Sequence, residues 1–173
     1  MPDMIIVAGP NGAGKSTFGD LFLRRQTKPF TYINADEIEK DIVKLQSTKP
    51  EREFAAARIA LRRLACAVDA GENIMIETTL AVRTYANAIP KWQLLGYRVG
   101  LSYLRLPSAE IAIERVRRRV ALGGHNIQVD VIRRRFDTGR LYLETLYKPA
   151  VDEWYVWDSI EGDFVPAEAW NLP

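Results

Sequence analysis

The stretch GPNGAGKST at residues 9–17 constrains the fold of this 173-residue chain more than any other feature. It fits the pattern GxxxxGK(S/T) and lies between MIIVAG, a run typical of a buried strand, and an amphipathic run typical of a helix. Glycines at this spacing let backbone N–H groups turn inward around phosphate oxygens, and the helix N-terminus attracts the same anion. The stretch therefore predicts a nucleoside-triphosphate site on an α/β fold.

Each part of this loop has an expected task. Lys15 is expected to reach the β- and γ-phosphates of ATP, and the Ser16 hydroxyl to ligate Mg²⁺. A chance glycine-rich turn is the simpler alternative, but the flanking strand and helix argue against it. The other residues expected to bind the nucleotide are Gly9, Pro10, Asn11, Gly12, Ala13, Gly14 and Thr17.

Short apolar runs alternate with helical patterns along the chain. This alternation predicts a P-loop kinase-like three-layer α/β/α fold with a parallel five-stranded sheet. We expect one domain over residues 1–173, with a helical Arg-rich lid over about 108–146. The tail EGDFVPAEAWNLP is too short and too proline-broken to assign. The expected strands are residues 4–9, 30–35, 73–77, 97–106 and 153–158.

Composition narrows the classes of protein. A formal net charge of +2 gives little support for nucleic-acid binding, and no apolar run approaches the roughly 18 residues needed to span a bilayer. We expect no targeting segment, because the loop begins only eight residues after Met1. A cytoplasmic protein without membrane contact is the expectation.

The segment 51–70 predicts a long amphipathic helix, ended by Gly71. Cys66 lies within it, and a lone cysteine there is expected to be a small buried apolar residue. The apolar positions at helical spacing are Phe54, Ala57, Leu61, Leu64 and Val68.

Two carboxylates follow expected strands. Open parallel sheets place ligand sites at the carboxyl ends of their strands, so Asp36 and Glu77 are expected to face the γ-phosphate from the acceptor side. That arrangement suits an enzyme that deprotonates an acceptor hydroxyl beside ATP. The alternatives are that Asp36 and Glu39 form a helix capping box, and that Glu77 is a solvated residue.

Arginines gather in two helical runs. Arg115 and Arg119 share one side of the first helix with Arg118, and Arg134 lies on the second with Arg133 and Arg135. His125, the only histidine, lies between the two helices. Two such clusters hinged over a phosphate loop would neutralise a γ-phosphoryl transition state. A solvated helix face and nucleic-acid binding are the alternatives, and no base-reading motif supports the latter.

The remaining strings separate the classes of nucleotide-binding protein. Neither the LSGGQ signature of transporter ATPases nor the NKxD motif of GTPases occurs. Trp154 and Trp157 bracket the last expected strand, where core packing is favoured over contact with a nucleotide base. A compact phosphotransferase with a carboxylate base and an arginine lid fits what remains.

At this point the sequence resembles a known family. GPNGAGKST, INADEI, IETTL, ERVRRRVALGGHNI, IRRRF and VWDS occur in the order and spacing of the zeta-toxin-like P-loop kinases, over about residues 4–160. The likeness is to the short, single-domain bacterial branch. That branch usually reads GGHxVP, whereas this chain has Gln128 in the proline position.

The resemblance implies an activity and a set of roles. It implies transfer of the γ-phosphate of Mg-ATP to a hydroxyl of a nucleotide sugar such as UDP-N-acetylglucosamine, with Asp36 as base and Glu77 positioning the sugar. Arg115 would lie on the transferring phosphate, and a second cationic role would pass to His125 or to Arg119, Arg134 or Arg135. An antitoxin partner is not evident from the residues. Another small metabolite or a polynucleotide hydroxyl as acceptor, or an ATP-gated binding module without catalysis, stays open.

Overall fold

The computed structural model describes residues 1–42, 48–124 and 126–170. Its strands are β1 (Asp3–Ala8), β2 (Thr31–Asn34), β3 (Ile74–Thr78), β4 (Arg98–Arg105), β5 (Glu153–Ile160) and β6 (Asp163–Ala169). Its helices are α1 (Lys15–Arg24), α2 (Ala35–Ile42), α3 (Lys49–Asp69), α4 (Thr84–Leu94), α5 (Ala109–Ala121) and α6 (Val129–Tyr142), which continues as the π-helix η1 (Leu143–Tyr147).

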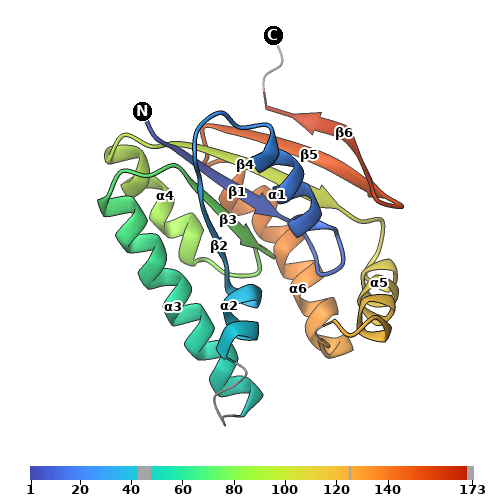
Figure 1. The fold of residues 1–173 in the computed structure, drawn as a ribbon. Helices are drawn as coiled ribbons and strands as arrows, with labels where there is room; N and C mark the ends of the chain where they lie inside the picture. The colour runs from blue at the N-terminus through green and yellow to red at the C-terminus, as the bar shows by residue number, and fades with distance from the viewer. Residues whose placement is uncertain (43–47, 125, 171–173) are drawn as a thin grey trace.

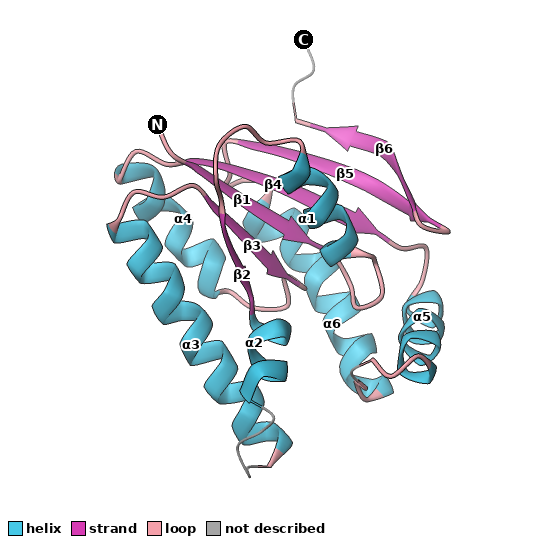
Figure 2. Cartoon of the chain, viewed as in Figure 1, coloured by secondary structure: helices cyan, strands magenta, loops and turns pink. Residues whose placement is uncertain are grey.

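The strands form one sheet in the order β2-β3-β1-β4-β5-β6 (Figure 2). Every neighbouring pair is parallel except β5 and β6, which are antiparallel. The α/β fold is as predicted, but the expectation of five parallel strands was wrong, because the sheet has six strands and the last one reverses direction. The order places β1, and the loop that follows it, in the interior of the sheet.

The sequence of the tail did not predict strand β6, for two physical reasons. The hairpin turns through Glu161 and Gly162, which both have positive φ, 46° and 103°. Two-residue turns of this kind usually carry Asn or Asp before the glycine, so Glu161 is a weak signal. Pro166 stands inside β6, which is tolerated because β6 is an edge strand and the pairing with β5 is irregular opposite it.

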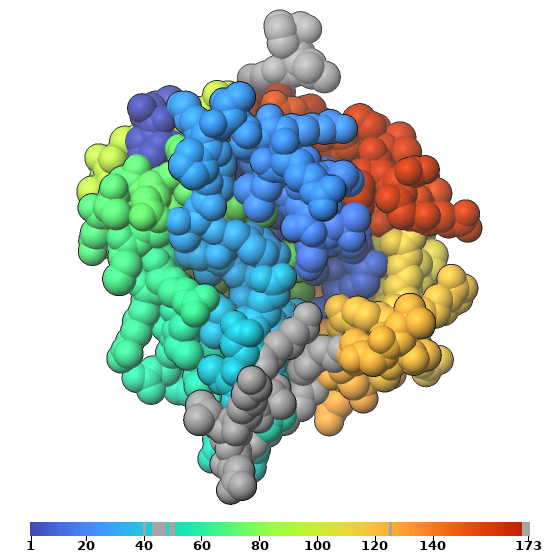
Figure 3. All heavy atoms as spheres, viewed as in Figure 1, coloured from blue at the N-terminus to red at the C-terminus, as the bar shows by residue number. Residues whose placement is uncertain are grey.

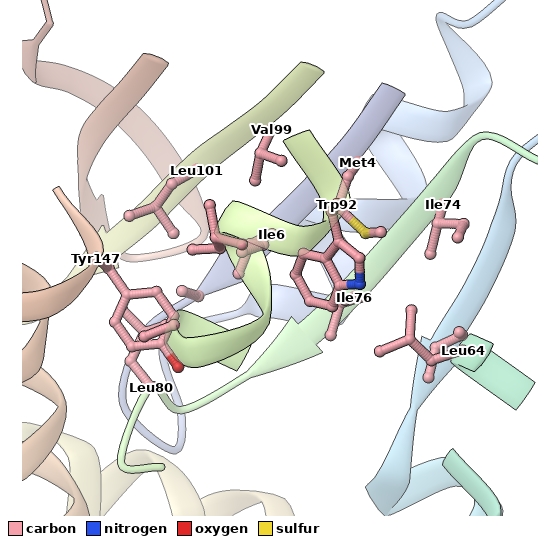
Figure 4. Close-up of a cluster of buried hydrophobic side chains, with 14 of the residues drawn as sticks. Met4, Ile6, Leu64, Ile74, Ile76, Leu80, Trp92, Val99, Leu101 and Tyr147 are labelled. Atoms are coloured by element: carbon pink, nitrogen blue, oxygen red, sulfur yellow. The ribbon is translucent and has the colours of Figure 1, made fainter. Parts of the chain in front are cut away.

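One face of the sheet carries the larger buried cluster (Figure 4). Met4 and Ile6 of β1 point into it, and Trp92 of α4 and Tyr147 of η1 close over them. The other face packs against α1, where a Cβ on Gly19 would lie 3.0 Å from Met75 of β3. Figure 1 shows α1 crossing in front of the strands. Helices on both faces bury the central strands and hold the strand ends rigidly.

A second buried cluster joins α5 and α6 to the phosphate loop. Ala13 of the loop packs there with Ala112 and Val116 of α5 and with Ile132 and Phe136 of α6. Gly139 lies so close to the loop after β3 that an added Cβ would meet the Thr79 carbonyl oxygen at 2.4 Å. The Arg-rich helices are therefore packed onto the body of the domain in this structure.

Helix α3 buries only part of the face that the sequence predicted: Leu64 is buried and Val68 packs against the core, but the other expected positions are exposed. Its buried residues are Ala56, Ala60, Leu64 and Ala67, whereas Phe54 is 68% exposed and Leu61 42% exposed. The small side chains let α3 lie close to its neighbours, and the larger ones are left at the surface.

Cys66 is exposed, so the expectation of a buried cysteine was wrong. Gly71 ends the helix with a φ of 66°, as the sequence predicted. In the described part of the chain, no helix is long and apolar enough to cross a membrane.

Candidate active site

The loop after β1 leads directly into α1. Gly12 and Gly14 have φ values of 79° and 84°, a left-handed conformation that glycine adopts without steric cost. An added Cβ on Gly9 would lie 2.5 Å from the Leu104 carbonyl oxygen, so glycine alone fits there. The first N–H groups of a helix lack intrahelical partners, and those of α1 begin at Lys15. The loop is thus a backbone cradle suited to phosphate oxygens.

Lys15 lies at the centre of the charged groups. Its side chain is buried and its Nζ donates a hydrogen bond to the Pro10 carbonyl oxygen at 3.1 Å. Burial lowers the pKa of Lys15, the carboxylates of Glu77 and Asp36 oppose that shift, and the charges of Arg119 and Arg135 add to it. Two carboxylates and two guanidinium groups therefore lie within electrostatic reach of this lysine.

Glu77 belongs to a hydrogen-bond network rather than to the solvent. Ser16 Oγ donates to Glu77 Oε2 at 2.9 Å, and the Tyr32 hydroxyl donates to the same oxygen at 2.5 Å. Asn34 Nδ2 donates to the Tyr32 oxygen at 3.0 Å. Burial and the neighbouring Glu77 charge raise the pKa of Tyr32. The phenol therefore stays protonated and acts as a donor.

Asp36 lies in the first turn of α2, two residues after the capping residue, whereas a capping box would require Asp36 itself to be the cap. Asn34 caps this helix instead, since its Oδ1 accepts the Asp36 backbone N–H at 2.9 Å. The capping-box expectation was therefore wrong for Asp36 and Glu39, because the residue two positions earlier makes the bond. Within residues 1–42, 48–124 and 126–170, the Asp36 carboxylate has no hydrogen-bond or ion-pair partner, and it is exposed.

Lys15, Asn34, Asp36 and Glu77 line one cleft of about 810 Å³. Arg134 and Arg135 of α6 line the same cleft. Figure 3 shows the face of the molecule that is turned to the viewer in Figure 1. The blue N-terminal segments occupy its middle, with green α3 on one side and yellow-orange α5 on the other. We call the part of the cleft lined by α2, α3, the loop before α4 and the start of α4 the far wall; its residues include Glu39, Glu53, Ala56, Ala57, Leu61, Ala81, Val82 and Tyr85.

The arginines divide into three groups. Arg115 donates to Ser159 Oγ at 2.8 Å, to the Ser159 carbonyl oxygen at 3.0 Å and to the Gly12 carbonyl oxygen at 3.4 Å. It therefore joins α5 to the phosphate loop and to the end of β5. Arg118 pairs with Glu114 and Arg133 with Glu110, both at the exposed surface.

The third group faces the cleft. Arg134 and Arg135 line it, and in the part of the chain that the structure describes neither guanidinium has an ion-pair or hydrogen-bond partner. Arg119 contributes its charge to Lys15. His125 lies outside the described residues.

The β5–β6 hairpin supports the loop from the other side. Phe18 of α1 packs against Trp157 at 5.5 Å and against the edge of Phe164 at 5.1 Å between ring centroids. A Cβ on Gly14 would lie 3.2 Å from Phe164. Trp154 packs on Lys148 and Trp170. Both tryptophans of β5 are thus engaged in packing, as the sequence favoured.

The sequence singled out neither Tyr32 nor Glu53 as a site residue. A signal for Tyr32 was present, because alternation along TYIN places Tyr32 and Asn34 on one face of β2. Asn34 pairs in register with Glu77, but that register becomes known only from the sheet.

The residues present fit a magnesium–nucleotide complex. Ser16 Oγ and Glu77 Oε2 are two oxygen donors at the start of α1, the ligand type that Mg²⁺ prefers. No group of three or more His, Cys, Asp or Glu side chains in the described ranges could hold a metal ion. Magnesium bound here would take its remaining ligands from water and phosphate, which is its usual behaviour in nucleotide sites.

Comparisons with known proteins show the fold and the family of this chain. An uncharacterised protein of Haemophilus influenzae is 27% identical over 133 residues, which cover 76% of this chain and 91% of that protein. A chain from the PezAT chromosomal toxin–antitoxin system of Streptococcus pneumoniae superposes with a TM-score of 0.71 at 16% identity, over 98% of this chain and 72% of that chain. A chain of the Pnkp1/Rnl/Hen1 RNA repair complex superposes with a TM-score of 0.68 at 18% identity, over 96% of this chain and 48% of that chain. The family model described as Zeta toxin matches residues 1–150, so this chain belongs to the zeta toxin family of P-loop kinase-like proteins.

Proposed function

We propose that this protein is a kinase that transfers the γ-phosphate of Mg-ATP to a hydroxyl of a UDP-activated sugar such as UDP-N-acetylglucosamine. The observation that carries the proposal is the position of Asp36, a carboxylate without a hydrogen-bond or ion-pair partner among the described residues, in the same cleft as Lys15 of the phosphate loop. Membership of the zeta toxin family and the kinase-like fold support phosphoryl transfer. The choice of acceptor rests on the family resemblance and on the shape of the cleft.

The donor half of the site would be the loop and the start of α1. The N–H groups of the loop and Lys15 would hold the triphosphate, and Ser16 and Glu77 would hold magnesium. Magnesium bound there would neutralise charge that develops on the phosphate oxygens. The contact of Glu77 with Ser16 favours this task over the positioning of the sugar.

The acceptor half would be the start of α2. Asp36 would take the proton of the acceptor hydroxyl as its oxygen forms a bond to the γ-phosphorus, while the bond to the bridging oxygen breaks and ADP leaves. Arg119 and Arg135, whose charges reach Lys15, would stabilise the transferring phosphoryl group, and Arg134 is placed beside them. Arg115 would have to leave Ser159 to contact that group, so in this structure it supports the loop.

The far wall of the cleft suits an acceptor of mixed character. Its apolar part, which includes Ala57, Leu61 and Val82, could cover a nucleoside base. The carboxylates of Glu39 and Glu53 could accept hydrogen bonds from sugar hydroxyls, and Arg134 and Arg135 could pair with a diphosphate. A volume of about 810 Å³ lies within the range of small-molecule sites.

Incubation with Mg-ATP and a panel of UDP-sugars, read by phosphorus NMR, tests the proposal. A new phosphomonoester signal on one acceptor, with release of ADP, is the expected result. A folded protein that binds ATP and phosphorylates no UDP-sugar would contradict the acceptor. The same panel, extended to other metabolites with hydroxyl groups and to polynucleotide ends, shows whether the kinase uses one of these acceptors instead of a UDP-sugar. Binding of ATP with no transfer to any compound would favour a binding module.

A further inference from the structure

A chain of hydrogen bonds joins the phosphate loop to the start of α2. On the donor side, Ser16 Oγ and the Tyr32 hydroxyl both donate to Glu77 Oε2, at 2.9 and 2.5 Å. On the acceptor side, Asn34 Nδ2 donates to the Tyr32 oxygen at 3.0 Å, and Asn34 Oδ1 accepts the Asp36 N–H at 2.9 Å. We call Ser16, Glu77, Tyr32 and Asn34 the relay.

The Asp36 backbone amide fixes the direction of the bonds from Asn34 to Glu77, and the Glu77 carboxylate can only accept from Ser16. An N–H group can only donate, so the Asp36 amide requires Oδ1 of Asn34 to face it, and Nδ2 must then face Tyr32. The Tyr32 oxygen accepts from Asn34, and its single proton is left for Glu77. Asn34 is buried and Tyr32 half-buried, so water does not compete freely for these bonds.

We propose that Tyr32 and Asn34 are positioning residues that hold Glu77 so that Ser16 turns its lone pairs, not its proton, toward a divalent cation. A serine hydroxyl has one proton, and Ser16 donates it to Glu77. Without the Tyr32 bond, the Glu77 carboxylate could rotate and the Ser16 hydroxyl would lose its fixed orientation. The proposal rests on the proposed function only in taking the loop to bind a metal–nucleotide complex.

Two nearly isosteric variants test the relay. Tyr32→Phe removes the hydroxyl alone. Asn34→Asp keeps the acceptor for the Asp36 N–H but replaces the amide donor by a carboxylate oxygen, which would draw the Tyr32 proton away from Glu77. The matched control is Tyr97→Phe, because the Tyr97 hydroxyl donates to the Glu72 carbonyl oxygen at 3.0 Å at the opposite end of the strands.

The measurement is a calorimetric titration of Mg²⁺ into protein saturated with a non-hydrolysable ATP analogue. Outer-shell partners of metal ligands typically contribute tenfold or more to affinity, so the half-saturating Mg²⁺ concentration should rise about tenfold in Tyr32→Phe and Asn34→Asp. Tyr97→Phe should match the wild type, and binding of the analogue in EDTA should be unchanged in both tyrosine variants. A folded Tyr32→Phe variant with wild-type Mg²⁺ affinity would overturn the relay. If Asn34→Asp does not fold, the result for Tyr32→Phe alone decides whether the relay holds.

This titration needs no acceptor, so its outcome is separate from that of the sugar panel. A wild type that binds magnesium with the analogue but phosphorylates no sugar would overturn the acceptor and leave the relay intact. A wild type that binds the analogue without any response to Mg²⁺ would overturn both.

Discussion

At the scale of single residues, Lys15 shows the conflict between stability and ligand binding most clearly. Lys15 is a buried cation, and burial lowers its pKa from an ordinary value of 10.5. Between the lowered and the ordinary pKa the unfolded chain binds more protons than the folded one, so stability rises with pH across that window. Below the window the burial penalty is present in full.

Lys15→Met should therefore be more stable than the wild type when no nucleotide is bound. At neutral pH we expect a higher melting temperature, by about 2–4 °C for each kcal/mol of relieved penalty in a chain of this size. The difference should narrow as pH approaches 10.5, where the unfolded lysine also loses its proton. Thermal melts across pH measure this, with exposed Lys91→Met as the control. A variant less stable than the wild type would contradict the assignment.

Asp36→Asn tests the base. The carboxylate has no hydrogen-bond or ion-pair partner to lose within the described ranges, so the variant should fold and should still bind ATP. Loss of a general base typically lowers kcat by about 10²–10⁴-fold. Steady-state rates with the acceptor found in the panel measure the effect. Asp41→Asn, at an exposed position on the same helix, is the control. Full activity of Asp36→Asn would remove Asp36 as the base.

The sequence predicted which residues come together at the cleft where their positions follow from local spacing. Lys15 and Ser16 come from the motif, and Asp36 and Glu77 from the rule that parallel strand ends meet at one edge. Tyr32 could not be found in this way, because its bond to Glu77 depends on how β2 and β3 pair. Asn34 and Asp36 are both residue types that cap helices, so propensity alone could not choose between them.

At the scale of elements, the β5–β6 hairpin ties the end of the chain to its beginning. Phe164 of β6 packs on Phe18 and approaches Gly14, so a strand that the sequence left unassigned supports the phosphate loop. The failure had a local cause, since a Glu-Gly turn and an internal proline both disguise a hairpin. The helices that carry the arginines were placed correctly because their amphipathic pattern is long.

Phe164→Ala should weaken both stability and nucleotide binding. Truncation of a fully buried phenylalanine costs about 3–5 kcal/mol, and for this half-buried ring we expect about 2 kcal/mol. The urea midpoint should fall with an unchanged slope, and ATP affinity should fall because Gly14 loses its packing partner. Val165→Ala, at a neighbouring position 47% exposed, should change neither. Equal effects of the two substitutions would contradict a supporting role for Phe164.

At the scale of the whole molecule, the phosphate loop lies where the two buried clusters meet. Ala8, at its start, belongs to the cluster under α3 and α4, and Ala13 belongs to the cluster under α5 and α6. Arg115 adds a polar link from α5 to Gly12 and Ser159. A ligand bound at the loop is therefore expected to stabilise both clusters together, as one cooperative unit.

Calorimetry with and without Mg-ATP tests whether the two buried clusters unfold as one cooperative unit. A ligand at about 100 times its Kd stabilises by about 2.7 kcal/mol, which for a chain of this size corresponds to a rise of about 5–10 °C in melting temperature. The transition should stay single as it moves, because the clusters share the loop, and Lys15→Met should show no rise. If the Arg-rich helices were an independent lid, Mg-ATP would instead split the transition into two. A split would contradict the single domain, whereas the absence of any shift in the wild type would contradict nucleotide binding itself.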